Sequence, residues 1–348
     1  MTKTLLVFGL LLLVFSTAYG QVNKQEDKLI IERIKWLYQL KRVIGTKYWF
    51  GYSSKKAEVT LAYFTNSKTY IVNPDISLKN RLNLTLKYKD SVVCIFINDK
   101  RVDTKDFHME TAYDSGDSSL IYYKNPVMMC SDYETTKKFV SDVNSLQKWG
   151  SMVMHEYFHG FQFKHYNFLS YANDSISISG TKLQSFYDSH NWYKDGVDKE
   201  NLLLLACLSS DNKASIKSNL KKLFAIRQNR RLMFQDSLHF DVSKQEDFLE
   251  KTEGSSRYIE WQLFKSFEWI PINKTLKKID TAYDESTYKN FNLEREPWMY
   301  EANSIRYFYS TGFNFLRLLD KLNIEYKKNF FNDNTSTPEN LLLKFIMN

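Results

Sequence analysis

Three of the six histidines of this chain lie between Met152 and His165, in the stretch MVMHEYFHGFQFKH. His155, Glu156 and His159 form the pattern H-E-x-x-H. If this stretch is helical, the two histidines share one face and the carboxylate lies about 100° away around the helix. Two neutral imidazoles are half of a tetrahedral zinc site, and a carboxylate beside it can take a proton from a metal-bound water. The pattern therefore predicts a Zn²⁺-dependent hydrolytic centre that needs a third protein ligand.

The residues around this motif are apolar, which predicts a buried helix. They are Met152, Val153, Met154, Tyr157, Phe158 and Phe161. Histidines and a glutamate are costly to bury without partners, which favours a functional site over a coincidental match. The alternative is a pair of hydrogen-bonded histidines in the core.

Two residues are candidates for the third ligand. His165 lies six residues after His159, but six residues on a continuing helix turn through about 240°, so His165 would face away from the metal. Zinc motifs with that spacing have a glycine where this chain has Gln162. Glu253 is favoured because the small residues that follow it allow close helix packing. A Glu-Gly pair in a charged helix is otherwise a solvated surface feature, so the residues alone leave the third ligand open.

The stretches HEYFHGFQ and EGSSRYIEW together resemble the gluzincin zinc metallopeptidases, in the broad peptidase-MA-like group. In that group H-E-x-x-H-x-x-Q is followed, on a second helix, by E-G-x-A-x-Y-x-E. The resemblance covers about twenty residues. It implies His155, His159 and Glu253 as metal ligands, with Glu156 as general base. Glu253 lies 94 positions after His159, farther than in thermolysin-like members, and Ser256 stands where alanine is frequent.

A third stretch, RYFYSTGFNFLRLLDKL at residues 306–322, is similar to the C-terminal helix of such proteins. The resemblance implies Tyr309, three residues before Gly312, as a hydrogen-bond donor to the developing oxyanion. Arg306 and Tyr307 compete for this role. The structural alternative for Tyr309 is an aromatic stripe packed in the core.

The rest of the chain predicts an α+β fold: a strand-rich part up to residue 130, then a larger, mainly helical part over 131–348 that carries the H-E-x-x-H helix. We treat 21–348 as one metallopeptidase-like domain. The predicted strands are 57–64, 68–73, 91–99 and 119–124, and the predicted helices are 25–45, 197–209, 213–235, 244–268, 301–322 and 338–347. The resemblance implies a zincin-like arrangement, a small mixed sheet whose edge strand holds a peptide by strand addition. The stretch SLIYYKNPVMMCS, residues 119–131, is the candidate edge strand.

The N-terminus predicts a secretory signal peptide over residues 1–20. Lys3 is followed by TLLVFGLLLLVF, and the small residues Ala18 and Gly20 precede the expected cleavage site. We therefore expect a secreted or periplasmic protein, with a retained N-terminal anchor as the alternative. No second long apolar run follows, so we expect no stable membrane insertion after signal removal.

Charge and cysteine content exclude several classes of protein. The formal net charge is +8, but the basic residues are scattered among acids, which argues against nucleic-acid binding. Cys94, Cys130 and Cys207 are too far apart for a cysteine zinc site or a disulfide framework, and leave room for one bridge. The sequence predicts no oligomeric state.

The leading hypothesis is a zinc metallopeptidase that hydrolyses peptide or protein substrates. Glu156 activates a metal-bound water in this hypothesis, and Tyr309 or a neighbour supports the tetrahedral intermediate. One alternative is a catalytically inactive peptide- or protein-binding module on a zincin-like scaffold, which the intact Glu156 disfavours. Another is a zinc hydrolase of non-peptide amides. The sequence has no G-x-M-E-N motif, which weakly disfavours an aminopeptidase.

Overall fold

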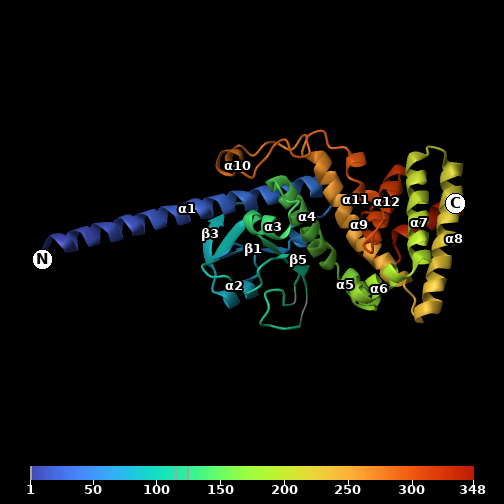
Figure 1. Cartoon of the computed structure of the whole chain (residues 1–348), viewed down its shortest axis with the longest axis horizontal. Coiled ribbons are helices and arrows are strands. Elements are labelled where there is room, and N and C mark those ends of the chain that lie inside the picture. Colours follow the sequence, from blue (N-terminus) through green and yellow to red (C-terminus); the bar gives the residue numbers. More distant parts are fainter. Residues whose placement is uncertain (1, 114–115, 124) are drawn as a thin grey trace.

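The computed structural model describes residues 2–113, 116–123 and 125–348. It has the predicted α+β fold, with a six-stranded mixed sheet in the N-terminal part and a larger helical part after it (Figure 1). The structure does not describe the side chains of residues 1–20. The signal peptide predicted there therefore stays a prediction. Within the described residues, none of the helices combines the length and the apolar character needed to cross a membrane.

Helix α1, Thr2–Lys47, contains the helix predicted over 25–45. It runs two residues beyond Gly45, and the amides of Tyr48 and Trp49 both bond the carbonyl of Ile44. Apolar residues every three or four positions place one stripe in the core, formed by Ile30, Ile34, Leu37, Leu40 and Ile44. This stripe packs α1 against α4 and α9, the two helices that carry the motif residues.

The sheet has the strand order β3-β4-β2-β1-β6-β5. Its strands are β1 Thr60–Phe64, β2 Thr69–Val72, β3 Thr85–Lys89, β4 Cys94–Asn98, β5 Met109–Ala112 and β6 Val127–Ser131. β1 and β6 are parallel, and the other neighbours are antiparallel. Alternate residues of β1 enter different apolar clusters, Leu61 and Tyr63 on the helix side and Ala62 and Phe64 on the other. The predicted strands 57–64, 68–73 and 91–99 are confirmed as β1, β2 and β4.

The strand predicted over 119–124 is wrong. Residues 119–123 form turns and bends, and residue 124 lies outside the described part. The amide of Leu120 bonds the carbonyl of Asp117, and the amide of Tyr123 bonds that of Leu120. These short-range bonds hold the backbone in consecutive turns, so the apolar run cannot join a ladder.

The predicted edge strand over 119–131 is also wrong. Among the residues of that stretch that the structure describes, Val127–Ser131 alone form a strand, β6, and it lies inside the sheet between β1 and β5. The edge beside β6 is formed by β5, Met109–Ala112. The sequence META has no apolar alternation, so periodicity gave no indication of this strand.

The helical part follows β6 and contains the residues of the H-E-x-x-H motif. Its helices are α3 Tyr133–Phe139, α4 Leu146–Phe163, α5 Tyr166–Ser175, α6 Gly180–Ser189, α7 Asn191–Ser209, α8 Lys213–Leu238, α9 Ser243–Ser266, α10 Lys274–Ile279, α11 Pro297–Tyr300, α12 Tyr307–Lys321 and α13 Pro338–Met347, while α2, Ile76–Leu82, lies between β2 and β3. The predicted helices 197–209, 213–235, 244–268 and 338–347 are confirmed. The helix predicted over 301–322 begins only at Tyr307, because a turn from Ser304 precedes it.

Helix α4 lies between the sheet and α9, with α7 and α8 beyond α9 (Figure 1). Its N-terminus is capped by Ser145, whose hydroxyl accepts a hydrogen bond from the amide of Lys148 at 3.3 Å. Trp149, Val153 and Phe158 are fully buried, and each such side chain contributes about 2–3 kcal/mol of burial free energy. This packing fixes the rotation of α4 and thereby the face that meets α9.

Helices α9 and α12 cross at two glycines. A Cβ added to Gly254 would lie 2.5 Å from the backbone of Gly312, and a Cβ on Gly312 would lie 2.3 Å from the carbonyl oxygen of Glu250. Only glycine permits this backbone-to-backbone contact. It confirms that small residues after Glu253 allow close helix packing, and the partner is α12.

Buried ion pairs connect α7, α8 and α9. Arg227 and Arg230 of α8 are at most 2% exposed. Arg227 binds Glu200 of α7 at 2.9 Å and Glu250 of α9 at 2.5 Å. Arg230 binds Glu200 and Glu246, each at 2.6 Å. We call these five residues the arginine cluster; it fixes the packing of the N-terminal half of α9.

Candidate metal centre

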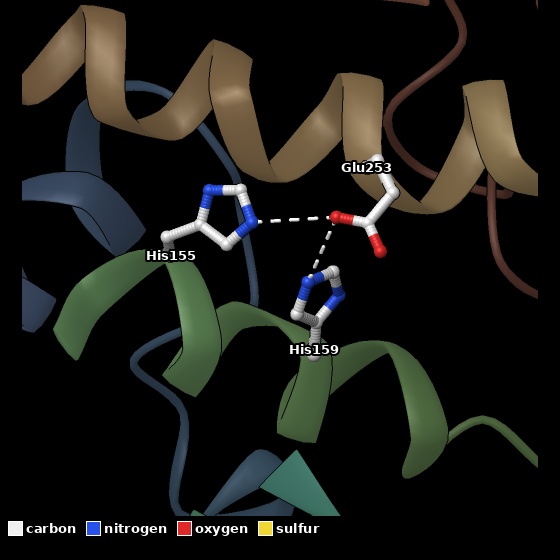
Figure 2. A group of neighbouring side chains, drawn as sticks. All are labelled: His155, His159 and Glu253. Atoms are coloured by element: carbon white, nitrogen blue, oxygen red, sulfur yellow. Dashed lines mark hydrogen bonds and ion pairs between the residues drawn. The ribbon is translucent and has the colours of Figure 1, made fainter. Parts of the chain in front are cut away.

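The structure brings His155 and His159 of α4 together with Glu253 of α9. Both imidazoles point from α4 toward α9, and the carboxylate points back toward them (Figure 2). The Nε2 atoms of His155 and His159 lie 3.4 Å and 3.3 Å from the same atom, Oε2 of Glu253. Within the described part of the chain, these three residues form the one group of histidine, cysteine or acidic side chains with metal-binding spacing.

The spacing of these atoms fits a zinc ion. Two ligand atoms at about 2.1 Å from a tetrahedral ion are about 3.4 Å apart, so the two measured separations match this geometry. One ligand atom from each of the three residues lies within 4.8 Å of the others. Two imidazole nitrogens and one carboxylate oxygen are also a donor set that zinc prefers, and three protein ligands leave a place for water. His155, His159 and Glu253 therefore fit a zinc ion.

The outer nitrogen of each imidazole has its own partner. Nδ1 of His155 lies 3.1 Å from Oε2 of Glu260. Nδ1 of His159 lies 3.0 Å from Oε1 of Gln162, whose amide nitrogen donates to the carbonyl of Thr252 at 2.9 Å. Such outer partners orient a histidine ring and direct its Nε2 toward the metal. Both rings are thus fixed with Nε2 facing Glu253.

Sequence reasoning missed these outer partners. Glu260 lies two helical turns after Glu253, a spacing of seven that keeps both on one face of α9. Gln162 was considered as the residue that replaces a glycine and as the last residue of the pattern H-E-x-x-H-x-x-Q, without a role, although its spacing of three from His159 places it beside that ring. Ser256, the departure from alanine, contacts the same ring, since its hydroxyl lies 3.3 Å from Nδ1 of His159.

Electrostatics tie the three groups together. Burial lowers the pKa of His155, but the charge of Glu260 and hydrogen bonds to Glu253 and Glu260 outweigh it and raise this pKa to about 10. Burial raises the pKa of Glu253, yet the charge of His159 and the hydrogen bonds from both imidazoles lower it well below its usual range. Without metal the imidazoles therefore tend to be protonated, and zinc and protons compete for the same nitrogens.

Glu156 lies next to this cluster and is not part of it. Burial raises the pKa of its carboxyl, partly opposed by the charges of His159 and His155. Its backbone carbonyl accepts a hydrogen bond from the hydroxyl of Thr111 on β5. Among the described residues no side chain donates a hydrogen bond to its carboxylate, which leaves both oxygens available as proton acceptors.

Tyr309 of α12 lies against the centre. Its ring stacks on that of His155 at 6.0 Å between centroids, and the guanidinium of Arg257 lies 4.8 Å from its ring centroid. Burial, with the charge of Glu253 and a hydrogen bond to it, raises the pKa of Tyr309 well above its usual value. The phenol stays protonated and can act as a donor.

The two competitors of Tyr309 lie elsewhere. The hydroxyl of Tyr307 lies 2.8 Å from that of Tyr193 and donates to Glu246, within the network around the arginine cluster. Arg306 is exposed, at the N-cap of α12. Of the three candidates, Tyr309 is the one whose ring contacts His155 of the candidate metal centre.

His165 is not part of the group formed by His155, His159 and Glu253, although the helix on which the prediction depended does not continue to it. Helix α4 ends at Phe163, and His165 is the N-cap of α5. Its Nδ1 lies 2.9 Å from the side-chain oxygen of Asn332, and its ring packs on Phe161 and Phe331. Its role is in packing.

The cysteines contribute nothing to the centre. Cys94, Cys130 and Cys207 are all free thiols, and the last two are buried. The disulfide for which the sequence leaves room is not formed among them. Burial raises the pKa of both Cys130 and Cys207, which keeps these thiols protonated.

In comparisons with protein-family models, curated proteins and solved structures, no match to this chain was found. A functional assignment therefore depends on the arrangement of the side chains around His155, His159 and Glu253.

Proposed function

We propose that this chain is a zinc-dependent peptidase. The observation that carries the proposal is the convergence of two Nε2 atoms and one carboxylate oxygen at tetrahedral spacing, with the carboxyl of Glu156 close enough to interact electrostatically with both histidines. His155, His159 and Glu253 would hold the ion. When bound, zinc would polarise a substrate carbonyl and lower the pKa of a bound water toward about 7.

The neighbouring side chains have the properties that amide hydrolysis requires. Glu156 accepts a proton from the attacking water and delivers it to the leaving amine. Its raised pKa brings it closer to the operating pH, which favours both transfers. Tyr309 donates a hydrogen bond to the carbonyl oxygen as negative charge develops there. Glu260 and Gln162 hold the imidazoles in position throughout.

The edge strand β5 favours a peptide over other amides. β5 pairs with β6 on one side and ends the sheet on the other. It packs against α4, where the hydroxyl of Thr111 bonds the backbone carbonyl of Glu156. A peptide added to a sheet edge uses main-chain hydrogen bonds, which do not depend on its sequence. A strand bound there would run past Glu156.

The test compares wild-type protein with Glu156→Gln, each saturated with zinc, on a mixed peptide library. We expect both to bind one zinc per chain, while the variant loses about 10²- to 10⁴-fold in rate because the general base is gone. Glu268→Gln, at an exposed position beyond α9, is the matched control and should keep full activity. Full activity of Glu156→Gln would reject the mechanism. Stoichiometric zinc without any cleavage by the wild type would favour an inactive binding module.

A further inference from the structure

A pocket of about 510 Å³ lies between α6, α9 and the start of α12. We call it the α6 pocket. Its walls are mostly apolar, and they include Ile178, Leu183, Leu249, Ile305 and Phe308. Its volume is in the range of about 300–1,000 Å³ that ligand pockets occupy.

Two of the elements that line the α6 pocket, α9 and α12, also carry residues of the candidate centre. Leu249 lies one helical turn before Glu253 on α9, so the two side chains are neighbours on one face. Phe308 directly precedes Tyr309, and their rings lie 5.2 Å apart between centroids. Leu249 and Gln245, which both line the pocket, lie four and eight residues before Glu253. These spacings correspond to about 6 Å and about 12 Å along a helix. An extended peptide covers these lengths with about two to four residues.

The wall opposite α12 is held in place. The buried amide of Gln245, one turn before Leu249, clamps the segment between α5 and α6. Its oxygen accepts hydrogen bonds from the amides of Ser177 and Ile178 at 3.3 and 3.0 Å, and its nitrogen donates to the carbonyl of Ile178 at 2.9 Å. The pocket is therefore formed before any ligand binds, which lowers the entropy lost on binding.

Charge limits what the α6 pocket accepts. Arg306 is the charged residue among the described side chains that line it, and no carboxylate lines it. A lysine or arginine side chain would meet a like charge there without a counter-ion. An apolar side chain would gain buried contact area at no electrostatic cost.

We propose that the α6 pocket selects substrates of this peptidase: it receives a large apolar side chain, such as leucine or phenylalanine, two to four residues from the cleaved bond, and it rejects lysine and arginine. This inference depends on the proposed function, because it names the substrate class of the same centre.

Gly180 offers a direct test. It lines the pocket, and a Cβ added to it would meet nothing within 4 Å, so larger side chains can enter without displacing the backbone. Gly180→Trp fills the pocket, and Gly180→Ala is the matched control. After a library has located the selective position, kcat/KM is measured on peptides that differ only there, with Leu, Ala or Lys. We expect the wild type and Gly180→Ala to prefer Leu over Ala by about tenfold or more, and Gly180→Trp to lose this preference.

Binding provides a second measurement that does not depend on turnover. The Leu peptide is titrated into Glu156→Gln and into the double variant Glu156→Gln with Gly180→Trp. We expect about tenfold weaker binding to the double variant, since the apolar side chain has lost its pocket. Equal affinities, or equal side-chain preferences of Gly180→Trp and Gly180→Ala, would overturn the pocket and leave the proposed function intact. A zinc-loaded wild type that cleaves no peptide would overturn both.

Arg306→Gln tests the exclusion of cationic side chains. We expect kcat/KM for the Lys peptide to rise several-fold relative to the Leu peptide, because the repelling charge is gone. Because Arg306 is exposed, the rise should shrink at high salt. An unchanged Lys-to-Leu ratio would show that this arginine does not determine specificity.

Discussion

Helix α9 carries two buried polar clusters that differ in one respect. In the arginine cluster, Glu246 and Glu250 face the guanidinium groups of Arg230 and Arg227 at 2.5–2.6 Å. One turn farther along, the carboxylate of Glu253 faces two imidazoles at 3.3–3.4 Å. The first set of pairs is closed, because each charge has its opposite in contact. The second set converges on a shared point, with room for an ion at its centre.

Charge states separate the clusters further. Burial alone would lower the pKa of Arg230 and raise that of Glu246, but their mutual attraction outweighs this, so the pKa of the arginine rises and that of the glutamate falls. Both stay charged at any physiological pH. At the centre, the raised pKa values of His155 and Glu156 make the protonation state adjustable. Closed pairs specify packing, whereas groups that can exchange protons and ligands are suited to chemistry.

The closed cluster also positions the open one. Glu250 accepts a hydrogen bond from the hydroxyl of Thr311 on α12 at 2.6 Å. Thr311 is adjacent to Gly312, which contacts α9 at Gly254. Tyr309 lies two residues before Thr311. The arginine cluster therefore fixes α9 and α12 relative to one another, and with them Glu253 and Tyr309.

The largest expected effect comes from Glu253→Gln. It removes the anionic ligand, so zinc affinity should fall by more than the ten- to hundredfold that is typical for loss of an outer partner. The fold should remain, because this carboxylate takes no part in the closed pairs. Zinc titration and circular dichroism measure the two properties. Retained zinc affinity would contradict the distinction between the clusters.

The matched substitution one turn earlier, Glu250→Gln, should act on stability. It takes one charged partner from the buried Arg227, and breaking a buried pair costs about 3–5 kcal/mol. Urea unfolding measures this loss. The folded fraction should still bind one zinc per chain, because the substitution removes no proposed ligand and the remaining pairs of the arginine cluster still hold α9. A stable Glu250→Gln that fails to bind zinc would show that the two clusters are not separate.

An intermediate effect is expected for Glu260→Gln, which weakens the outer partner of His155. Zinc affinity should fall about ten- to hundredfold while the stoichiometry remains one. Glu268→Gln, at an exposed position nearby, is the control and should change nothing. If both variants bind zinc alike, Glu260 does not orient the imidazole.

The smallest effect concerns protons. Because the pKa of His155 is raised to about 10 without metal, this ring is protonated at pH 7, and zinc requires it neutral. Zinc binding at pH 7 should therefore release at least about one proton, and affinity should rise about tenfold per pH unit below 10. Titration calorimetry in buffers of different ionisation enthalpy measures this release. Arg230 and Glu246 of the arginine cluster, which stay charged, should contribute none.

Local periodicity was sufficient to predict part of the centre. The spacing of four places His155 and His159 on one face, whereas His165 lies beyond the end of α4, so the argument from a continuing helix does not apply to it. Glu253 was indicated by the small residues after it, which the glycine contact with α12 explains. The shared face of the two histidines could be predicted because it depends on the helix alone, whereas Glu253 was indicated by the resemblance and by small residues whose partner, α12, the sequence did not identify.

Features that depend on distant partners could not be predicted. Strand β5 has no apolar alternation and forms because its backbone pairs with that of β6. Residues 119–123 have the composition of a strand, but local turns determine their backbone. Glu260 and Gln162 gain their roles only when α4 and α9 meet. Arg227 and Arg230 belong to a charged stretch of sequence, and their burial depends on acids from α7 and α9.

The origin of the ligands on two helices has a consequence for biosynthesis. A growing chain exposes His155 and His159 long before Glu253, which lies 94 positions after the second histidine, has been made. Helices α5 to α8 are synthesised in between, and α9 must dock on α4 before the carboxylate reaches the imidazoles. Two histidines alone hold zinc weakly. If the chain is the zinc peptidase that we propose, its centre would therefore be completed only after α9 has been synthesised and has docked on α4.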